Sequence, residues 1–281
     1  MPDPPLIDAH VHLWDPRHFR MPWLDGNGRL DRAFGPTEFG RDTDGLGVEA
    51  VVYVQVDVTP AYGLLEARWA AEQGSLLAGI VAYAPIEDGA VVGSYLDALV
   101  KIDPRIKGVR RLIQSEADPE FHIRPDFLAG LRLLPAYGLS FDICIQQQQM
   151  ARSIQMVRAC PETFFVLDHL GKPNVLAAQL EPWRDQIDEL AELPNVVCKI
   201  SGLVTEADHA HWTVADLKPY VQHVLAAFGE DRVLFGGDWP VVTMAASYRQ
   251  WVTSLDQLTS HLSSDARRKL WADNARRVYR L

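Results

Sequence analysis

Short apolar runs alternate along this chain with longer stretches in which apolar residues recur every three or four positions. The short runs are rich in Val, Ile, Leu and Phe, which favours β-strands. Strands are predicted at residues 6–13, 51–56, 79–84, 107–113, 139–145, 163–169, 196–201 and 233–238. The longer stretches predict amphipathic helices, at residues 62–73, 91–100, 127–137, 148–160, 180–193, 221–228, 247–258 and 265–279. This alternation predicts an α/β fold with a parallel sheet.

The number of strands favours a closed barrel. Eight βα units in 281 residues are expected for a (β/α)8 TIM barrel, and an open doubly wound sheet is the alternative. No Gly-x-Gly-x-x-Gly or Walker motif opens a helix, which disfavours the nucleotide-binding open sheet. No linker or shift in composition divides the chain, so residues 1–281 are expected to form a single domain.

The first predicted strand contains two histidines, in the stretch Asp8-Ala9-His10-Val11-His12. Side chains alternate faces along a strand, so His10 and His12 are expected to point the same way. A pair of core histidines bonded to backbone is one interpretation. We favour a polar site, because two imidazoles on one inward face are costly to bury without partners and form a ready clamp for a metal or an oxyanion.

Polar side chains also stand at the ends of the other predicted strands, where the active sites of TIM barrels lie. They are Gln55, Asp57, Arg110, Arg111, Asp168, His169, Lys199, Ser201 and Asp238. Each alone can cap a turn or reach solvent. Their recurrence on apolar strands favours one shared site. Arg110 and Arg111 must point to opposite faces, so one of the two is expected to face outward.

Two loop segments add to this picture. The polar stretch 14–38 carries Trp23 and other aromatic residues, and a loop of this length in a compact domain is expected to be functional, as a lid over the site. A second His-x-His spacing, His209 and His211, falls in a polar loop after the seventh strand and is expected at the surface.

Charge and composition exclude several classes of function. The net charge is −10 and no basic stripe is present, which disfavours nucleic-acid binding. No apolar stretch approaches the length of a membrane span, and the N-terminus lacks the features of a signal peptide. The cysteines, Cys144, Cys160 and Cys198, form no Cys-x-x-Cys pair and are expected to be buried thiols of a cytosolic protein.

Several stretches together resemble the amidohydrolase superfamily, and more narrowly its branch of lactonases. These enzymes open L-fuconolactone, L-rhamnonolactone or 2-pyrone-4,6-dicarboxylate. The stretches are Ile7–Asp15, Leu167–Pro173, Lys199–Leu203, Phe235–Val241 and Asp273–Tyr279. The resemblance spans the whole chain and implies a (β/α)8 barrel that hydrolyses a cyclic ester.

The resemblance also implies residue roles. His10 and His12 match the first-strand pair of the family, His169 its strand-six histidine, Asp238 its catalytic aspartate and Arg110 a substrate-binding arginine.

Two departures from the family bear on its metal centre. Lys107 stands at the start of its strand rather than the end, and the fifth strand ends in Ile145-Gln146 without a histidine. At most one divalent ion, zinc by its ligand set, is therefore expected, and none is expected to be strictly required. Its ligands would be His10, His12, His169 and Asp238.

These residues supply the chemistry that a lactone needs. Asp238 can activate water as a general base, and the three histidines can polarise the carbonyl. Arg110 and Lys199 suit developing negative charge. Further side chains are expected to bind sugar hydroxyls or cover the sugar ring: Gln55, Gln146 and Ser201 for the hydroxyls, and Trp23 or Trp239 for the ring. The sequence therefore predicts a cytosolic hydrolase of a small sugar-acid lactone, and it does not predict the oligomeric state.

Three alternatives share some of these features. A pyrone-dicarboxylate lactonase would need several arginines for two carboxylates. A zinc-dependent decarboxylase of the same superfamily shares the histidines and the aspartate, but it needs a tightly held metal. A catalytically silent binding protein has no reason to retain four buried polar groups, which argues against that class.

Overall fold

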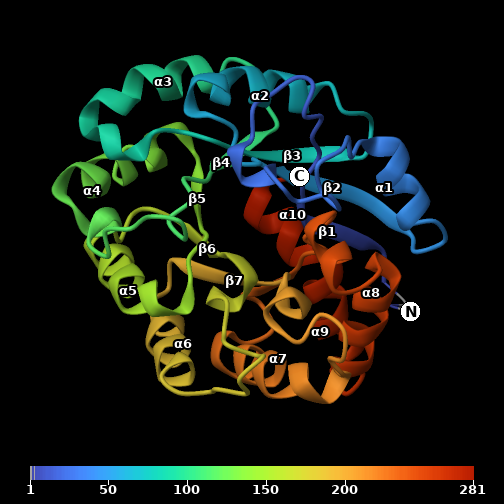
Figure 1. The fold of residues 1–281 in the computed structure, drawn as a ribbon. Helices are drawn as coiled ribbons and strands as arrows, with labels where there is room; N and C mark the ends of the chain where they lie inside the picture. The colour runs from blue at the N-terminus through green and yellow to red at the C-terminus, as the bar shows by residue number, and fades with distance from the viewer. Residues whose placement is uncertain (1, 3) are drawn as a thin grey trace.

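Eight parallel strands form the centre of the computed structural model, which describes residues 2 and 4–281 (Figure 1). The strands are β1 (Leu6–Val11), β2 (Val48–Val54), β3 (Leu77–Ala82), β4 (Ile106–Val109), β5 (Ser140–Ile143), β6 (Phe165–Leu167), β7 (Val196–Ile200) and β8 (Val233–Phe235). They lie side by side in chain order. Arg110, His169 and Asp238 lie just beyond strands that are shorter than predicted.

The first and last strands meet and close the barrel. Val11 forms a parallel bridge with Trp239. The His12 amide donates to the Trp239 carbonyl at 2.7 Å, and the Asp238 amide donates to the His10 carbonyl at 2.8 Å. The prediction of a (β/α)8 barrel is confirmed, and its closure places Asp238 directly beside the His-x-His pair.

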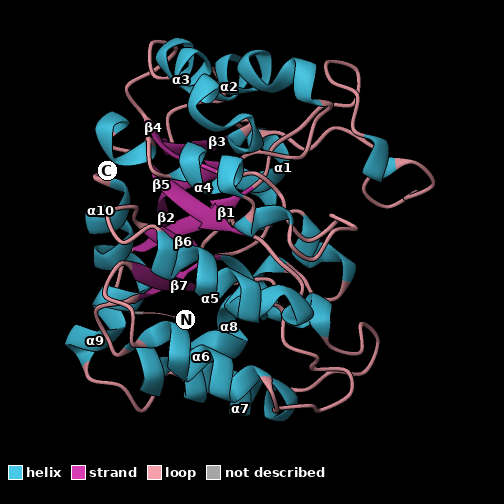
Figure 2. Ribbon diagram, turned by 90° about the vertical axis from the view of Figure 1, so that its left-hand side faces the viewer, coloured by secondary structure: helices cyan, strands magenta, loops and turns pink. Residues whose placement is uncertain are grey.

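Helices surround the strands (Figure 2). They are α1 (Pro36–Asp42), α2 (Gly63–Ala71), α3 (Val92–Leu99), α4 (Pro125–Leu131), α5 (Met150–Ala159), α6 (Trp183–Ala191), α7 (Val214–Phe228), α8 (Tyr248–Leu258), α9 (Ser264–Arg268) and α10 (Asn274–Tyr279). The sequence pattern did not reveal α1, because Phe39 is its one buried residue. The predicted helix 265–279 is divided, since a π-helical turn separates α9 from α10. Over the residues described, no helix has the length and hydrophobicity to cross a membrane.

The C-terminal helix α10 closes one end of the barrel and lies in red behind its centre in Figure 1. Tyr279 packs in a core cluster with strand residues such as Ile7, Val166 and Leu234. Its hydroxyl donates to Asp142 Oδ2 at 2.9 Å. This end is therefore filled, and an open site is left to the carboxyl ends of the strands.

The predicted lid is a packed cover rather than a free loop. Phe19, Leu24 and Leu30 are buried in the main core. Trp14 and Phe34 form an antiparallel bridge that holds the two ends of the segment together. The cover, residues 14–35, thus lies fixed over the carboxyl ends of the first strands, and α1 begins directly after it.

We predict that Tyr279→Phe lowers the free energy of unfolding by about 2 kcal/mol, because it removes a buried hydrogen bond to a charged group. Tyr137→Phe is the matched control, since its hydroxyl bonds Gly93 and Asp97 at the surface and its loss is expected to cost about 0.5 kcal/mol. Urea unfolding of both variants at pH 7 measures the difference. Equal losses would contradict the role given to α10.

Candidate active site

A cavity of about 280 Å³ opens at the carboxyl ends of the strands, under the cover. The cover contributes Trp14, Trp23, Asn27 and Leu30 to its walls. Polar side chains from the strand ends and the following loops complete it: His12, Asp57, Arg110, Gln114, Ser115, His169, Lys172, Thr205 and Asp238. The cavity is thus half covered by aromatic and aliphatic groups and carries its polar groups at the barrel end.

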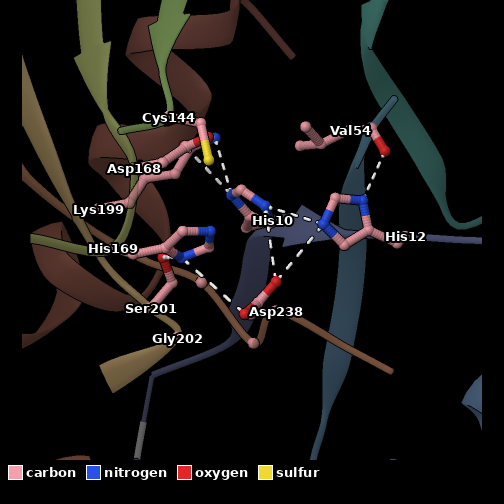
Figure 3. A network of polar contacts seen from close by, with 12 residues as sticks. His10, His12, Val54, Cys144, Asp168, His169, Lys199, Ser201, Gly202 and Asp238 are labelled. Carbon is pink, nitrogen blue, oxygen red and sulfur yellow. Dashed lines mark hydrogen bonds and ion pairs between the residues drawn. The ribbon is translucent and has the colours of Figure 1, made fainter. Parts of the chain in front are cut away.

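His10, His12 and Asp238 converge on one point (Figure 3). The two Nε2 atoms of the histidines lie 3.1 Å apart. Asp238 Oδ1 lies 3.4 Å from Nε2 of His12 and 3.8 Å from Nε2 of His10. The shared orientation predicted for the two histidines is therefore observed.

The second nitrogen of each imidazole fixes its tautomer. Nδ1 of His12 donates to the Val54 carbonyl at 2.7 Å, which leaves a lone pair on Nε2. Nδ1 of His10 lies 3.2 Å from Asp168 Oδ1, an acceptor, which favours the same tautomer. Two imidazole lone pairs and a carboxylate oxygen therefore face one another, an arrangement that calls for a cation or a donor between them.

The three converging atoms fit a zinc ion. Tetrahedral zinc with ligand bonds of 2.0–2.1 Å separates its ligand atoms by about 3.4 Å. The separations between Nε2 of His10, Nε2 of His12 and Oδ1 of Asp238 are 3.1, 3.4 and 3.8 Å. His169 belongs to a second, overlapping cluster with His10 and Asp168. A single ion would therefore be held best by His10, His12 and Asp238.

Burial and neighbouring charges set the protonation of the site. Burial alone would raise the pKa of Asp238, but His169 and the other two imidazoles hold it well below its usual range. Burial lowers the pKa of His169 to about 4. Near neutral pH Asp238 is therefore ionised and His169 is neutral, which suits a proton acceptor beside an uncharged imidazole.

A buried ion-pair network lies beneath His10. Lys199 Nζ is 2.6 Å from Asp142 Oδ2 and 3.0 Å from Asp168 Oδ1, and all three side chains are inaccessible to solvent. The same ammonium lies 3.3 Å from Nδ1 of His10. Burial raises the pKa of Asp142 to about 6 in spite of Lys199. The expectation that Lys199 contacts substrate is corrected: it lies below the cavity and supports His10.

Arg110 connects this network to the cavity. One terminal nitrogen of its guanidinium lies 3.1 Å from Asp168 Oδ2 and 3.3 Å from Nε2 of His10, and the other donates to the Gln55 carbonyl at 2.6 Å. Its Nε has no hydrogen-bond partner within the described residues. Arg111 points away and pairs with Glu87 and Glu116, as the alternation of faces predicts.

Several other predicted site residues lie outside the cavity. Gln55 and Ser201 are fully buried, and Ser201 Oγ instead contacts Nδ1 of His169 at 2.9 Å. Trp239 is buried against α1, where it bonds Asp42, so it cannot cover a sugar. Gln146 lines a neighbouring pocket. Ser201 thus lies on the same side as His169 but beneath the cavity, whereas Trp239 is turned toward α1.

Sequence reasoning assigned no role to other residues that line the cavity, notably Gln114 and Lys172. Lys172 Nζ donates to Gln114 Oε1 at 2.6 Å. Gln114 follows Arg110 and Leu112 at two-residue spacing, a signal that was available in the sequence. Cys144, expected in the core, is buried but forms part of the cavity wall.

The closed barrel, the His-x-His pair and the aspartate after β8 together define an amidohydrolase-type site. A family model described as amidohydrolase matches residues 7–281, and the chain belongs to this family. It is 32% identical over 289 residues to an L-fucono-1,5-lactonase of Burkholderia multivorans, covering 98% of this chain and 96% of that protein. It is 30% identical over 286 residues to an L-fucono-1,5-lactonase of Burkholderia ambifaria, with 98% and 95% covered.

A solved structure shows the same architecture. The crystal structure of an amidohydrolase from Burkholderia multivorans with bound zinc superimposes with a TM-score of 0.89 at 29% identity, over 99% of each chain.

We predict that Gly202→Ala impairs the site without a matching loss of stability. The new Cβ would lie 2.5 Å from Nδ1 of His169 and 2.9 Å from Oδ2 of Asp238, so both side chains must move. Hydrolytic kcat/KM is expected to fall about 100-fold, the cost of a misplacement near 1 Å.

Gly138→Ala is the control for the backbone strain at Gly202. Gly138 has a φ of +65°, close to the +59° of Gly202, and its Cβ would meet nothing within 4 Å. Both variants should lose about 1 kcal/mol of stability through the left-handed conformation. Comparable activity in the two variants would show that His169 and Asp238 need no exact placement.

Proposed function

We propose that the protein hydrolyses a sugar-acid lactone to the aldonic acid, with Asp238 as the general base. One observation carries the proposal: the ionised carboxylate of Asp238 and the uncharged imidazole of His169 meet at the end of a cavity of about 280 Å³ whose walls include neutral amide and hydroxyl side chains. The two L-fucono-1,5-lactonases at 30% and 32% identity support a cyclic sugar ester as the substrate.

Asp238, Arg110 and His169 have separate roles in the proposed reaction. Asp238 takes a proton from water, and the resulting hydroxide adds to the lactone carbonyl. Arg110 donates to the carbonyl oxygen as negative charge develops there. The Ser201 hydroxyl can donate to Nδ1 of His169, which leaves its Nε2–H as a second donor. When the ring C–O bond breaks, Asp238 returns its proton to the leaving alkoxide.

A bound metal ion would act together with these side chains and would not take over their roles. A zinc ion held by His10, His12 and Asp238 would polarise the carbonyl as a Lewis acid. Arg110 and His169 lie at the same cavity and supply hydrogen-bond donors of their own.

The charges at the cavity favour a neutral sugar over an aromatic dicarboxylate. Its cations are Arg110, already paired with Asp168, and Lys172, and Asp57 adds a carboxylate to the same walls. Two substrate carboxylates would meet one lysine, one arginine whose charge Asp168 already neutralises, and a carboxylate of their own sign. Amide and hydroxyl groups such as Asn27, Gln114 and Thr205 suit sugar hydroxyls instead.

Asp238→Asn is predicted to lower turnover by about 10²–10⁴-fold, because the amide keeps the size of the side chain but cannot accept a proton. Thermal unfolding should change little. Acid release from the best lactone measures the effect, and near-normal turnover in this variant would remove Asp238 from the mechanism.

A panel of aldonolactones, compared with 2-pyrone-4,6-dicarboxylate at equal concentration, tests the substrate class. We expect at least one sugar lactone to be opened fastest, with strong dependence on ring stereochemistry, since an unpaired buried polar group discriminates strongly. Faster hydrolysis of the pyrone than of every sugar lactone would refute the assignment and leave the barrel and Asp238 intact.

Chelation tests the dependence on metal. We expect lactonase activity largely to survive removal of divalent ions, because Arg110 and His169 can polarise the carbonyl without help. Metal content by mass spectrometry confirms that the ion is gone. A complete loss that zinc restores would contradict this expectation, and it would favour the metal-dependent decarboxylase if carbon dioxide is released from a carboxylated substrate.

A further inference from the structure

A second, larger pocket adjoins the cavity. This outer pocket has a volume of about 660 Å³ and is lined by residues 146–148 and by parts of 172–176 and 205–209. Lys172 and Thr205 border both spaces. The two spaces therefore adjoin at these two side chains.

The walls of the outer pocket are chiefly polar and uncharged. Gln146, Gln147, Gln148 and Asn174 contribute amide side chains to the lining, and an amide both donates and accepts hydrogen bonds as a sugar hydroxyl does. Within the protein, Gln147 donates to Gln186 and Asn174 accepts from the Ala177 amide. The apolar residues of its walls are Leu176 and Ala207. Such walls fit a hydroxylated group better than an acyl chain.

The charges of the outer pocket argue against an ionic occupant. Lys172 lies 3.9 Å from Glu206 and is also held by Gln114. Asp208 adds a second carboxylate, beside His209. An anionic group would meet Glu206 and Asp208, and a cationic group would meet Lys172 at the entrance, so a neutral group is favoured.

We propose that the outer pocket binds a second, neutral sugar unit, so that the preferred substrates are aldonolactones that carry a glycosyl substituent. The inference rests on the proposed lactonase function and names its substrate class. Trp23 and Asn27 of the cover form one part of the cavity wall, whereas Lys172 and Thr205 form the part that adjoins the outer pocket.

The reaction at the ring is unchanged by the substituent. Water adds across the ring ester, the ring C–O bond breaks, and a carboxylic acid and an alcohol form. The glycosidic bond stays intact, because the outer pocket lies beyond Lys172 and does not include Asp238 or His169.

The test compares one aldonolactone with its own glycosyl derivatives. The parent is the best substrate of the aldonolactone panel, and the derivatives carry a neutral hexose on each of its hydroxyls in turn. We expect kcat/KM for at least one derivative to exceed that of the parent about tenfold, equivalent to about 1.4 kcal/mol.

Two variants connect that preference to the outer pocket. In Gln147→Ala and Asn174→Ala, the ratio of kcat/KM for the derivative to that for the parent should fall about tenfold. Gln257→Ala, on the exposed face of α8, is the matched control and should keep the ratio. Circular dichroism verifies that each variant is folded.

The outcomes separate the two proposals. If the parent is hydrolysed but no derivative surpasses it, or if both variants keep the ratio, the inference about the outer pocket is overturned. If neither the parent nor any derivative releases acid, the proposed lactonase function itself fails.

Discussion

The position of His10 depends on a charge balance inside the barrel. Lys199, Asp142 and Asp168 are withdrawn from water, and each carboxylate is tolerated because the Lys199 ammonium lies within hydrogen-bond distance of it. In return the network orients the His10 ring, so that its Nε2 faces His12 and Asp238. Tyr279 donates to the same Asp142 from the opposite end of the barrel. The C-terminal helix is thereby connected to the site through buried polar contacts.

Closure of the barrel places Asp238 beside the histidines, as the buried charges position His10. The backbone bonds between His10 and Asp238 and between His12 and Trp239 bring the first strand and the last loop of the barrel into register. Close approach here requires Gly236, because a Cβ at that position would lie 2.9 Å from Cβ of His10. The proposed base therefore takes its place beside the histidines through hydrogen bonds between segments at opposite ends of the chain.

The cover and the outer pocket divide the carboxyl end of the barrel into two environments. Trp23 is fixed by a bond from its indole to the Val56 carbonyl, so the covered side has a set shape without any closing movement. Such a wall excludes water from a reacting ring. The opposite side carries amides and paired charges around Lys172. In the proposed function the covered side of the cavity binds the lactone ring, and the outer pocket binds the sugar unit attached to that ring.

The sequence by itself determined the eight strands, the common face of His10 and His12, and the opposed directions of Arg110 and Arg111. Each follows from a local period of two or from the length of an apolar run. A strand pattern predicts the face on which a residue lies but not its depth, and so it places Lys199 and Ser201 in the cavity although they lie beneath it.

Only the tertiary structure decided which loop residues reach the site. Lys172 and Gln114 meet because two loops that are distant in the chain fold over the same barrel end. Irregular backbone has no period from which a direction can be inferred, and its course is set by packing against the rest of the molecule.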